Sequence, residues 1–168
     1  DIRPLHAYQS ADYDGDSRAD LAVFRPSEKM WYVKGSTSSY NLNWGLQTDI
    51  PVVASRATGR IEPTVFRPSE GAFYYATTNL IYARWGMLGD IPVTESYSGK
   101  VSSNFAVYRP STGEWYIRYT ELPSGELLSQ TYRFGLSGDI PVPGKYSPDA
   151  FADIAVYRPS NSVWYIQH

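Results

Sequence analysis

Short apolar runs separated by turn-forming residues follow one another along all 168 residues of the chain. Aromatic and β-branched residues, which favour strands, are concentrated in these runs. No long segment repeats its apolar residues with the 3.6-residue period of a helix. Twelve prolines and thirteen glycines break the chain into short pieces. The pattern therefore predicts an all-β protein built from short antiparallel strands.

One phrase recurs through the chain. Phe-Arg-Pro-Ser or Tyr-Arg-Pro-Ser appears four times, at spacings of 42, 42 and 49 residues, and occupies residues 24–27, 66–69, 108–111 and 157–160. An aromatic pair follows each copy, and the phrase Asp-Ile-Pro-Val comes later, at residues 49–52, 90–93 and 139–142. Such a period is typical of repeat architectures. We therefore expect a single repeat domain over residues 1–168 with four units, 1–48, 49–89, 90–138 and 139–168.

Each unit can be divided into strands. We assign strand A to the segment after Asp-Ile-Pro-Val, and strand B to the apolar run that ends at Arg-Pro-Ser, because proline cannot donate to a ladder. Strand C is the aromatic run after the turn, and strand D ends at an aromatic–glycine step. Four strands in 42 to 49 residues are typical of a propeller blade. We expect a β-propeller or a propeller-like array of four four-stranded units.

The last unit ends after strand C and lacks strand D, which leaves fifteen predicted strands instead of sixteen. Three explanations remain open. The chain is cut from a longer array, the opening segment 1–10 serves as the closing strand, or a neighbouring molecule adds a strand to the unpaired edge.

Acidic residues are concentrated in one loop of the first unit. Four of them surround Gly15: Asp12, Asp14, Asp16 and Asp20. Carboxylates at alternate positions of a tight turn converge on one point, and hard oxygen ligands of this kind suit Ca²⁺. An EF-hand needs a glutamate at the twelfth position, where Val23 stands, so we expect a calcium loop between two strands. The competing interpretation is a solvated turn, in which the acids repel one another.

The corresponding loops of the other units have lost most of these acids and gained a basic residue. The residues aligned with the four acids are Lys145, Ser147, Asp149 and Asp153 in the fourth unit and Ser96, Ser98, Lys100 and Asn104 in the third. The second unit has a shorter loop that ends at Glu62, with Arg60 nearby. Our hypothesis is that a side-chain cation such as Lys145 takes over part of the metal's structural role in these loops.

The stretch from Asp12 to Ser27, with Asp-Ile-Pro-Val leading into the repeat and Trp-Tyr trailing it, resembles the FG-GAP/VCBS-type repeat of secreted bacterial proteins, integrin-like propellers and some lectins. The resemblance covers nearly the whole chain in four copies. The D-x-D-G-D-x-x-x-D motif is complete only at residues 12–20, where Ser17 replaces the usual glycine. The resemblance implies a β-propeller, calcium in the loop between strands A and B, an extracellular or cell-surface location, and binding or adhesion more often than catalysis.

Arginines and aspartates also recur in phase. The arginines are Arg25, Arg67, Arg109 and Arg158, and the aspartates are Asp49, Asp90 and Asp139. The arginines could form an anion-binding ring, but we favour an ion pair in each unit, in which the planar guanidinium ties strand B to the Asp-Ile-Pro-Val turn.

The aromatic residues offer a similar choice between sugar stacking and core packing. For the tryptophans we favour core packing between sheets, because bulk repeated once per unit usually has this role; they are Trp31, Trp44, Trp85, Trp115 and Trp164. Tyr13, Tyr40 and Tyr97 lie in or near loops, and we expect these three to be exposed candidates for ligand binding.

Composition excludes several classes of function. The absence of cysteine rules out thiol catalysis, disulfides and zinc–thiolate sites. A formal net charge of −2 gives no basic field for nucleic acid, and no apolar run approaches the roughly 20 residues of a membrane helix. The only histidines are His6 and His168, at opposite ends of the chain, and no Gly-x-Ser-x-Gly elbow is present. We therefore expect no enzyme activity.

The sequence thus predicts a non-enzymatic, calcium-stabilised extracellular module for binding or adhesion, with a protein or glycan on a surface as its ligand. Two alternatives remain. One is a structural subunit that forms a filament or surface layer by sharing strands through its unpaired edges. The other is a carbohydrate-binding, lectin-like module of a larger secreted protein.

Overall fold

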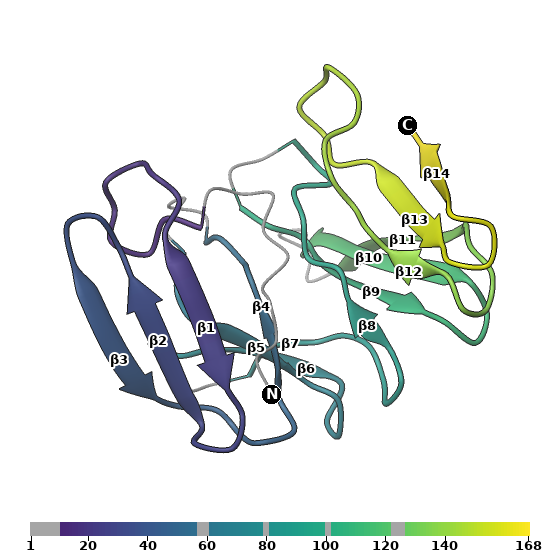
Figure 1. Ribbon diagram of the computed structural model, residues 1–168. Coiled ribbons are helices and arrows are strands. Elements are labelled where there is room, and N and C mark those ends of the chain that lie inside the picture. Colours follow the sequence, from purple (N-terminus) through teal and green to yellow (C-terminus); the bar gives the residue numbers. More distant parts are fainter. Residues whose placement is uncertain (1–10, 57–60, 79–80, 100–101, 122–126) are drawn as a thin grey trace.

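A computed structural model of the protein describes residues 11–56, 61–78, 81–99, 102–121 and 127–168 (Figure 1). These residues form fourteen strands and no helix, so the all-β prediction is confirmed. None of the described segments is therefore a helix long and apolar enough to cross a membrane.

The strands form four antiparallel sheets, and each sheet lies within one of the units expected from the repeats. The first sheet contains β1 (Leu21–Arg25), β2 (Met30–Lys34) and β3 (Ser39–Asn43). The second contains β4 (Ile50–Val52), β5 (Thr64–Arg67), β6 (Ala72–Tyr75) and β7 (Ile81–Arg84). The third contains β8 (Ile91–Pro92), β9 (Phe105–Arg109), β10 (Glu114–Glu121) and β11 (Leu127–Arg133). The fourth contains β12 (Ile140–Pro141), β13 (Ile154–Arg158) and β14 (Val163–Gln167).

The position of strand A differs from the prediction. The first strands of sheets two to four, β4, β8 and β12, are formed by the Ile-Pro phrase itself and not by the segment that follows it. The following segment makes only isolated bridges, such as Ser55 with Ile61, because the chain bends there into the loop before strand B. Proline fits in strand A because this strand is at the edge of its sheet. The strand A expected for the first unit lies in residues 1–10, outside the described residues.

Register gives each sheet two distinct faces. In the first sheet Phe24 pairs with Trp31 and Val23 pairs with Tyr32. The aromatic pair points to one side and the valine–tyrosine pair to the other, because successive side chains alternate across a strand. The same two pairs recur in the other sheets, as Phe66–Phe73 with Val65–Tyr74, Tyr108–Trp115 with Val107–Tyr116, and Tyr157–Trp164 with Val156–Tyr165. We call these two sides the aromatic face and the valine face.

The core lies between consecutive sheets. The aromatic face of the first sheet (Phe24, Trp31) packs on Val65 of the second sheet's valine face. Phe73 and Val107 share the next cluster, and Trp115 and Val156 the one after that. No cluster of described residues joins the first sheet to the fourth, and these two sheets stand apart in Figure 1. The described sheets therefore form a series in chain order.

Arginine–aspartate clamps fasten strand B to the turn before strand A, as predicted. Both nitrogens of the Arg67 fork bind the Asp49 carboxylate at 2.9 Å. The equivalent pairs are Arg109–Asp90 and Arg158–Asp139. Each guanidinium also stacks on the tyrosine of its sheet's valine–tyrosine pair. In the second sheet, for example, the Arg67 guanidinium carbon lies 4.3 Å from the Tyr74 ring centre. In the first unit Arg25 stacks on Tyr32 in the same way, but its described ion pair is with Glu28.

Core packing of the tryptophans is confirmed at Trp31 and Trp115, which are fully buried. Trp44 and Trp85 are half-buried and pack against the edges of two clusters. The prediction is wrong for Trp164, which is 53% exposed. The physical reason is that the described fold places no further sheet against the aromatic face of sheet four.

Candidate metal centre and adjoining pocket

The loop of residues 11–20 precedes β1 and is folded by its own carboxylates. Asp12 accepts hydrogen bonds from the amides of Gly15, Asp16 and Ser17 at 2.6, 3.1 and 2.8 Å. Gly15 and Ser17 both have a positive φ, 86° and 67°, which allows the chain to curl around the Asp12 side chain. The glycine is suited to this conformation, and the serine adopts it at some cost.

Asp14 anchors the loop to the tip of the β2–β3 hairpin. Its carboxylate accepts the amides of Thr37 and Ser38 at 2.8 and 3.0 Å. These amides lower the pKa of Asp14 to about 2, so the group is ionised under ordinary conditions. A side chain at Gly35 would lie 2.2 Å from the Asp14 carboxylate, which explains why glycine occupies this position of the hairpin.

Three of the four predicted metal ligands come together. Carboxylate oxygens of Asp12, Asp14 and Asp20 all lie within 4.8 Å of one another. Asp16 is not part of this group: its carboxylate accepts the amide of Arg18 at 2.9 Å and the hydroxyl of Ser36. The loop alone therefore supplies three convergent acids, and the fourth instead fastens the loop to the hairpin.

Asp20 is the buried member of the group, with only 8% of its surface exposed. Its Oδ2 atom accepts the amides of Tyr13 and Asp14 at 2.7 and 3.0 Å. Its Oδ1 atom is buried and has no hydrogen-bond partner among the described residues. A buried acceptor without a partner is costly, and more so when it carries charge. A bound cation or a hydrogen-bond donor at this oxygen would therefore stabilise the loop.

In the fourth unit the carboxylate at the equivalent position has partners for both of its oxygens. Asp153 aligns with Asp20, and its Oδ2 accepts the amides of Tyr146 and Ser147 at 2.7 and 2.9 Å. Its Oδ1 accepts the Ser147 hydroxyl at 3.2 Å, and Nδ1 of His168 lies 3.2 Å from the same oxygen, within hydrogen-bond distance. Burial opposes ionisation of Asp153, but these donors together hold its pKa below the usual value.

The third unit substitutes an amide for the acid. Asn104 aligns with Asp20, and its Oδ1 accepts the amide of Ser98 at 3.0 Å. Its Nδ2 donates to the backbone carbonyls of Arg118 and Tyr119 at 3.3 and 3.1 Å. In both units the atom equivalent to Asp20 Oδ1 therefore has a partner within the chain.

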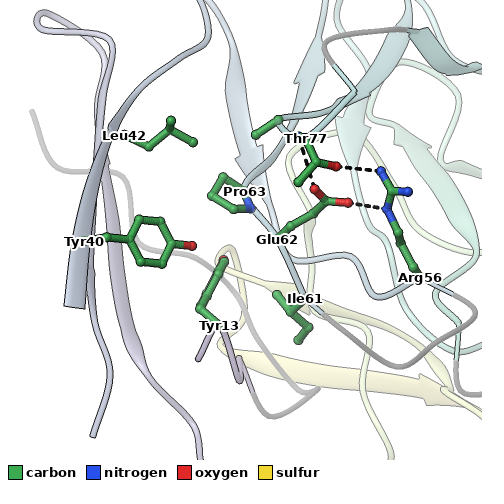
Figure 2. Close-up of a pocket in the computed structure, with 9 residues that line it drawn as sticks. Tyr13, Tyr40, Leu42, Arg56, Ile61, Glu62, Pro63 and Thr77 are labelled. Carbon is green, nitrogen blue, oxygen red and sulfur yellow. Dashed lines mark hydrogen bonds and ion pairs between the residues drawn. The ribbon is translucent and has the colours of Figure 1, made fainter. Parts of the chain in front are cut away.

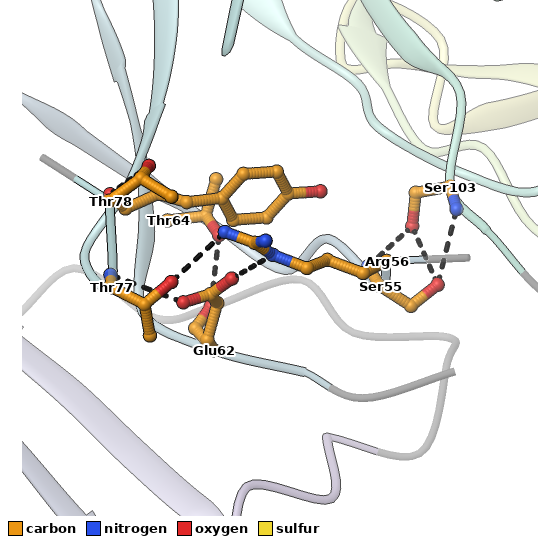
Figure 3. A network of polar contacts seen from close by, with 8 residues as sticks. Ser55, Arg56, Glu62, Thr64, Thr77, Thr78 and Ser103 are labelled. Carbon is orange, nitrogen blue, oxygen red and sulfur yellow. Dashed lines mark hydrogen bonds and ion pairs between the residues drawn. The ribbon is translucent and has the colours of Figure 1, made fainter. Parts of the chain in front are cut away.

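The second unit uses an arginine. Arg56 binds the buried carboxylate of Glu62 and donates to the Thr77 hydroxyl at 2.9 Å (Figure 3). The Thr77 amide also donates to Glu62, at 3.2 Å. Two serines beside this network join neighbouring loops, since the Ser55 amide donates to the Ser103 hydroxyl at 2.9 Å.

A side-chain cation does act in the second loop, and a histidine reaches the acid of the fourth, but neither is the residue predicted. Lys145 is exposed and has no ion pair within the described part of the chain, whereas His168 reaches Asp153. In the second unit the cation is Arg56, and Arg60 lies outside the described residues, as does Lys100 of the third unit. Sequence alignment alone could not find His168, because it comes from the end of strand C and not from the loop.

A cavity of about 550 Å³ lies beside the acid loop, between the first and second sheets. Figure 2 shows Tyr40 and Leu42 of β3 on one side and Arg56, bound to Glu62 and Thr77, on the far side. The remaining walls are largely apolar and are formed by Tyr13, Ile61, Pro63 and Ala76. Because Arg56 and Glu62 neutralise each other, the charged residues lining this cavity contribute no net charge.

The predicted exposure of the three loop tyrosines is wrong for two of them. Tyr13 and Tyr97 are buried against the clusters between sheets, and only Tyr40 is exposed. Tyr97 and Tyr146 each donate to the carbonyl four residues earlier, at 2.7 and 2.8 Å. The residue four positions before Tyr13 lies outside the described segments. Recurrence at the second position of three loops is the sequence signal that indicates this structural role.

Comparison of the chain with protein-family models, with curated proteins and with solved structures finds no match. The relationship to FG-GAP/VCBS-type repeats therefore stays a prediction from sequence motifs.

Proposed function

We propose that this chain is a calcium-stabilised, non-enzymatic binding module with a propeller-like arrangement of its four sheets. Asp20 supports the calcium proposal most directly. Its Oδ1 atom is buried without a partner beside two further carboxylates, whereas the equivalent atoms of Asp153 and Asn104 are satisfied by the chain. Among the described residues of the four loops, the first loop alone gathers three acids around such an oxygen.

Asp12, Asp14 and Asp20 would hold the ion, with carboxylate oxygens as its protein ligands. Oxygen-only coordination with tolerant geometry favours Ca²⁺ over Mg²⁺, which demands a near-ideal octahedron. The ion would offset the mutual repulsion of the acids and stiffen the loop against the β2–β3 hairpin. A Kd of about 10⁻⁴–10⁻³ M is enough for a module that works at extracellular calcium concentrations, which fits the proposed location outside the cell or on its surface.

Calcium titration tests this proposal. Isothermal titration calorimetry and melting curves, in calcium and in chelator, are compared for the wild type, Asp12→Asn and Asp149→Asn. We expect calcium to bind and raise the melting temperature of the wild type and of Asp149→Asn, whose exposed acid belongs to the fourth loop, but not of Asp12→Asn. A wild-type protein that binds no calcium at millimolar concentration contradicts the proposal.

A second proposal concerns the ligand, for which we favour a neutral carbohydrate in the cavity beside the loop. Tyr40 offers an aromatic surface at its rim, and apolar walls lead to a charge-neutral polar end at Arg56, Glu62 and Thr77. Aromatic faces combined with a few fixed polar groups suit a sugar ring, which has apolar faces and hydroxyl edges. The volume is within the range of small-molecule sites.

A glycan array followed by calorimetry tests the ligand. Tyr40→Ala should abolish binding of the sugar that the array identifies, because the ring surface is removed. Tyr82→Ala is the matched control, since Tyr82 is an exposed aromatic of β7 that does not line the cavity. A flat array, or equal loss in both variants, contradicts the carbohydrate proposal and leaves a protein ligand as the remaining class; neither result affects the calcium site.

A further inference from the structure

The three contacts between sheets follow one rule. In each, the aromatic face of one sheet packs on the valine face of the next, so that Val65, Val107 and Val156 are fully buried. The rule has a direction, because the earlier sheet always contributes its aromatic face. A series of four sheets built in this way uses three pairs of faces and leaves one face over at each end.

Within the described part of the chain, both faces left over carry exposed apolar side chains. On the aromatic face of sheet four, Trp164 is 53% and Ile166 39% exposed, whereas the equivalent Trp115 is fully buried. On the valine face of sheet one, Leu21 is 72% exposed and Val23 is half-buried. These two faces are the complementary halves of the contact that the chain makes three times internally.

We propose that the aromatic face of sheet four of one copy packs on the valine face of sheet one of a second copy. The occupant is inferred from continuity with the internal contacts: Trp164 would meet Val23 as Trp115 meets Val156. Head-to-tail contacts either close into a ring or extend into a fibre. Two copies joined at both ends give eight sheets, which is within the range of closed propellers, so the expected assembly is a dimer.

Addition of a strand to the edge of β14 is a different contact. Within the described residues β14 pairs only with β13, so its outer edge could accept a strand. An added strand lies in the plane of the sheet and leaves the face, and therefore Trp164, uncovered. Burial of Trp164 on association thus distinguishes face packing from strand sharing.

The test measures native mass by light scattering over a concentration series, for the wild type, Trp164→Asp, Leu21→Asp and Leu88→Asp. Leu88 is the control, because it is 78% exposed in the turn between β7 and β8, on neither open face. We expect the wild type and Leu88→Asp to be dimers and the other two variants to be monomers. Circular dichroism confirms that each variant is folded.

Mixing the two monomeric variants gives the decisive result. Trp164→Asp keeps an intact valine face on sheet one, and Leu21→Asp keeps an intact aromatic face on sheet four. We expect a one-to-one complex on mixing, and a shift of tryptophan emission to shorter wavelength as Trp164 leaves water. A monomeric wild type, or a dimer that persists in both variants, overturns the proposal. The result does not depend on calcium, and repeating it in chelator separates it from the proposed function.

Discussion

Asp20→Asn separates the metal-binding and the structural contributions of the acid loop. In chelator, the wild type carries a buried carboxylate oxygen without a hydrogen-bond partner among the described residues. Asparagine replaces this oxygen with an amide donor, which can point toward the nearby acids, while its own oxygen keeps the amides of Tyr13 and Asp14. Asn104 shows the same division in the third unit, where its oxygen accepts an amide and its nitrogen donates to backbone carbonyls. We therefore expect the variant to be more stable than the wild type in chelator.

The magnitude follows from the cost of an unsatisfied buried polar group, about 1–3 kcal/mol. For a chain of 168 residues, this corresponds to a rise in melting temperature of roughly 2–4 °C per kcal/mol. In calcium we expect the wild type to gain stability relative to the variant. With a Kd of about 10⁻⁴ M and about 5 mM calcium, the wild type gains about 2 kcal/mol by mass action. The variant, which has lost one ligand and one charge, should gain almost nothing.

Chemical denaturation in calcium and in chelator measures both effects on the same samples. Asp153→Asn is the matched control. Both oxygens of Asp153 accept donors, including His168 and Ser147, so an amide there would face donors and lower stability in both buffers. If Asp20→Asn is less stable than the wild type in chelator, or still responds to calcium, our reading of Asp20 is wrong.

Three further changes test other parts of the structure. Gly35→Ala should weaken calcium binding without altering an acid, because its methyl group would displace Asp14; calorimetry measures the affinity. Arg67→Met leaves the buried Asp49 without its ion pair and should cost about 3 kcal/mol in urea unfolding. The hydrogen bond from Arg158 is the main cause that lowers the pKa of Asp139 in the folded protein. The contribution of the ionised Asp139 to folding stability is therefore complete above about pH 4, and it is lost as the pH falls through the folded pKa. The stability difference between wild type and Asp139→Asn should therefore narrow in acid.

Much of the fold could be predicted from the sequence because the same pattern of strand and turn residues occurs in four copies. Strands B, C and D were placed correctly, and the in-phase arginines and aspartates predicted the clamp seen at Arg67 and Asp49. The predicted position of strand A was wrong because the Ile-Pro phrase is typical of a turn. Proline is accepted in a strand only at the edge of a sheet, and the sequence does not show which strand is at the edge.

The site was less predictable because its contacts come from elsewhere in the chain. The motif predicts Asp16 as a metal ligand, but Ser36 from the neighbouring hairpin donates to its carboxylate. His168 could not be foreseen as the partner of Asp153, fifteen residues away on strand C. The repeat pattern predicts a core position for Trp164 by analogy with Trp115, yet no described sheet packs on the face that carries Trp164. For Asp16 and Asp153 the missing information was which side chains meet within one unit. For Trp164 it was which sheet lies beside which.

Tyr13 connects the acid loop to the cavity. Its backbone amide donates to Asp20 at 2.7 Å, and its side chain lines the cavity. Any ion that fixes the Asp20 carboxylate therefore also restrains the backbone that carries this side chain. Coupling between two binding sites is reciprocal. If calcium raises the affinity of the cavity for a ligand that needs Tyr13 in place, that ligand would raise the affinity of the loop for calcium by the same factor. The loop would then be a regulatory element of the binding site as well as a brace for the first sheet.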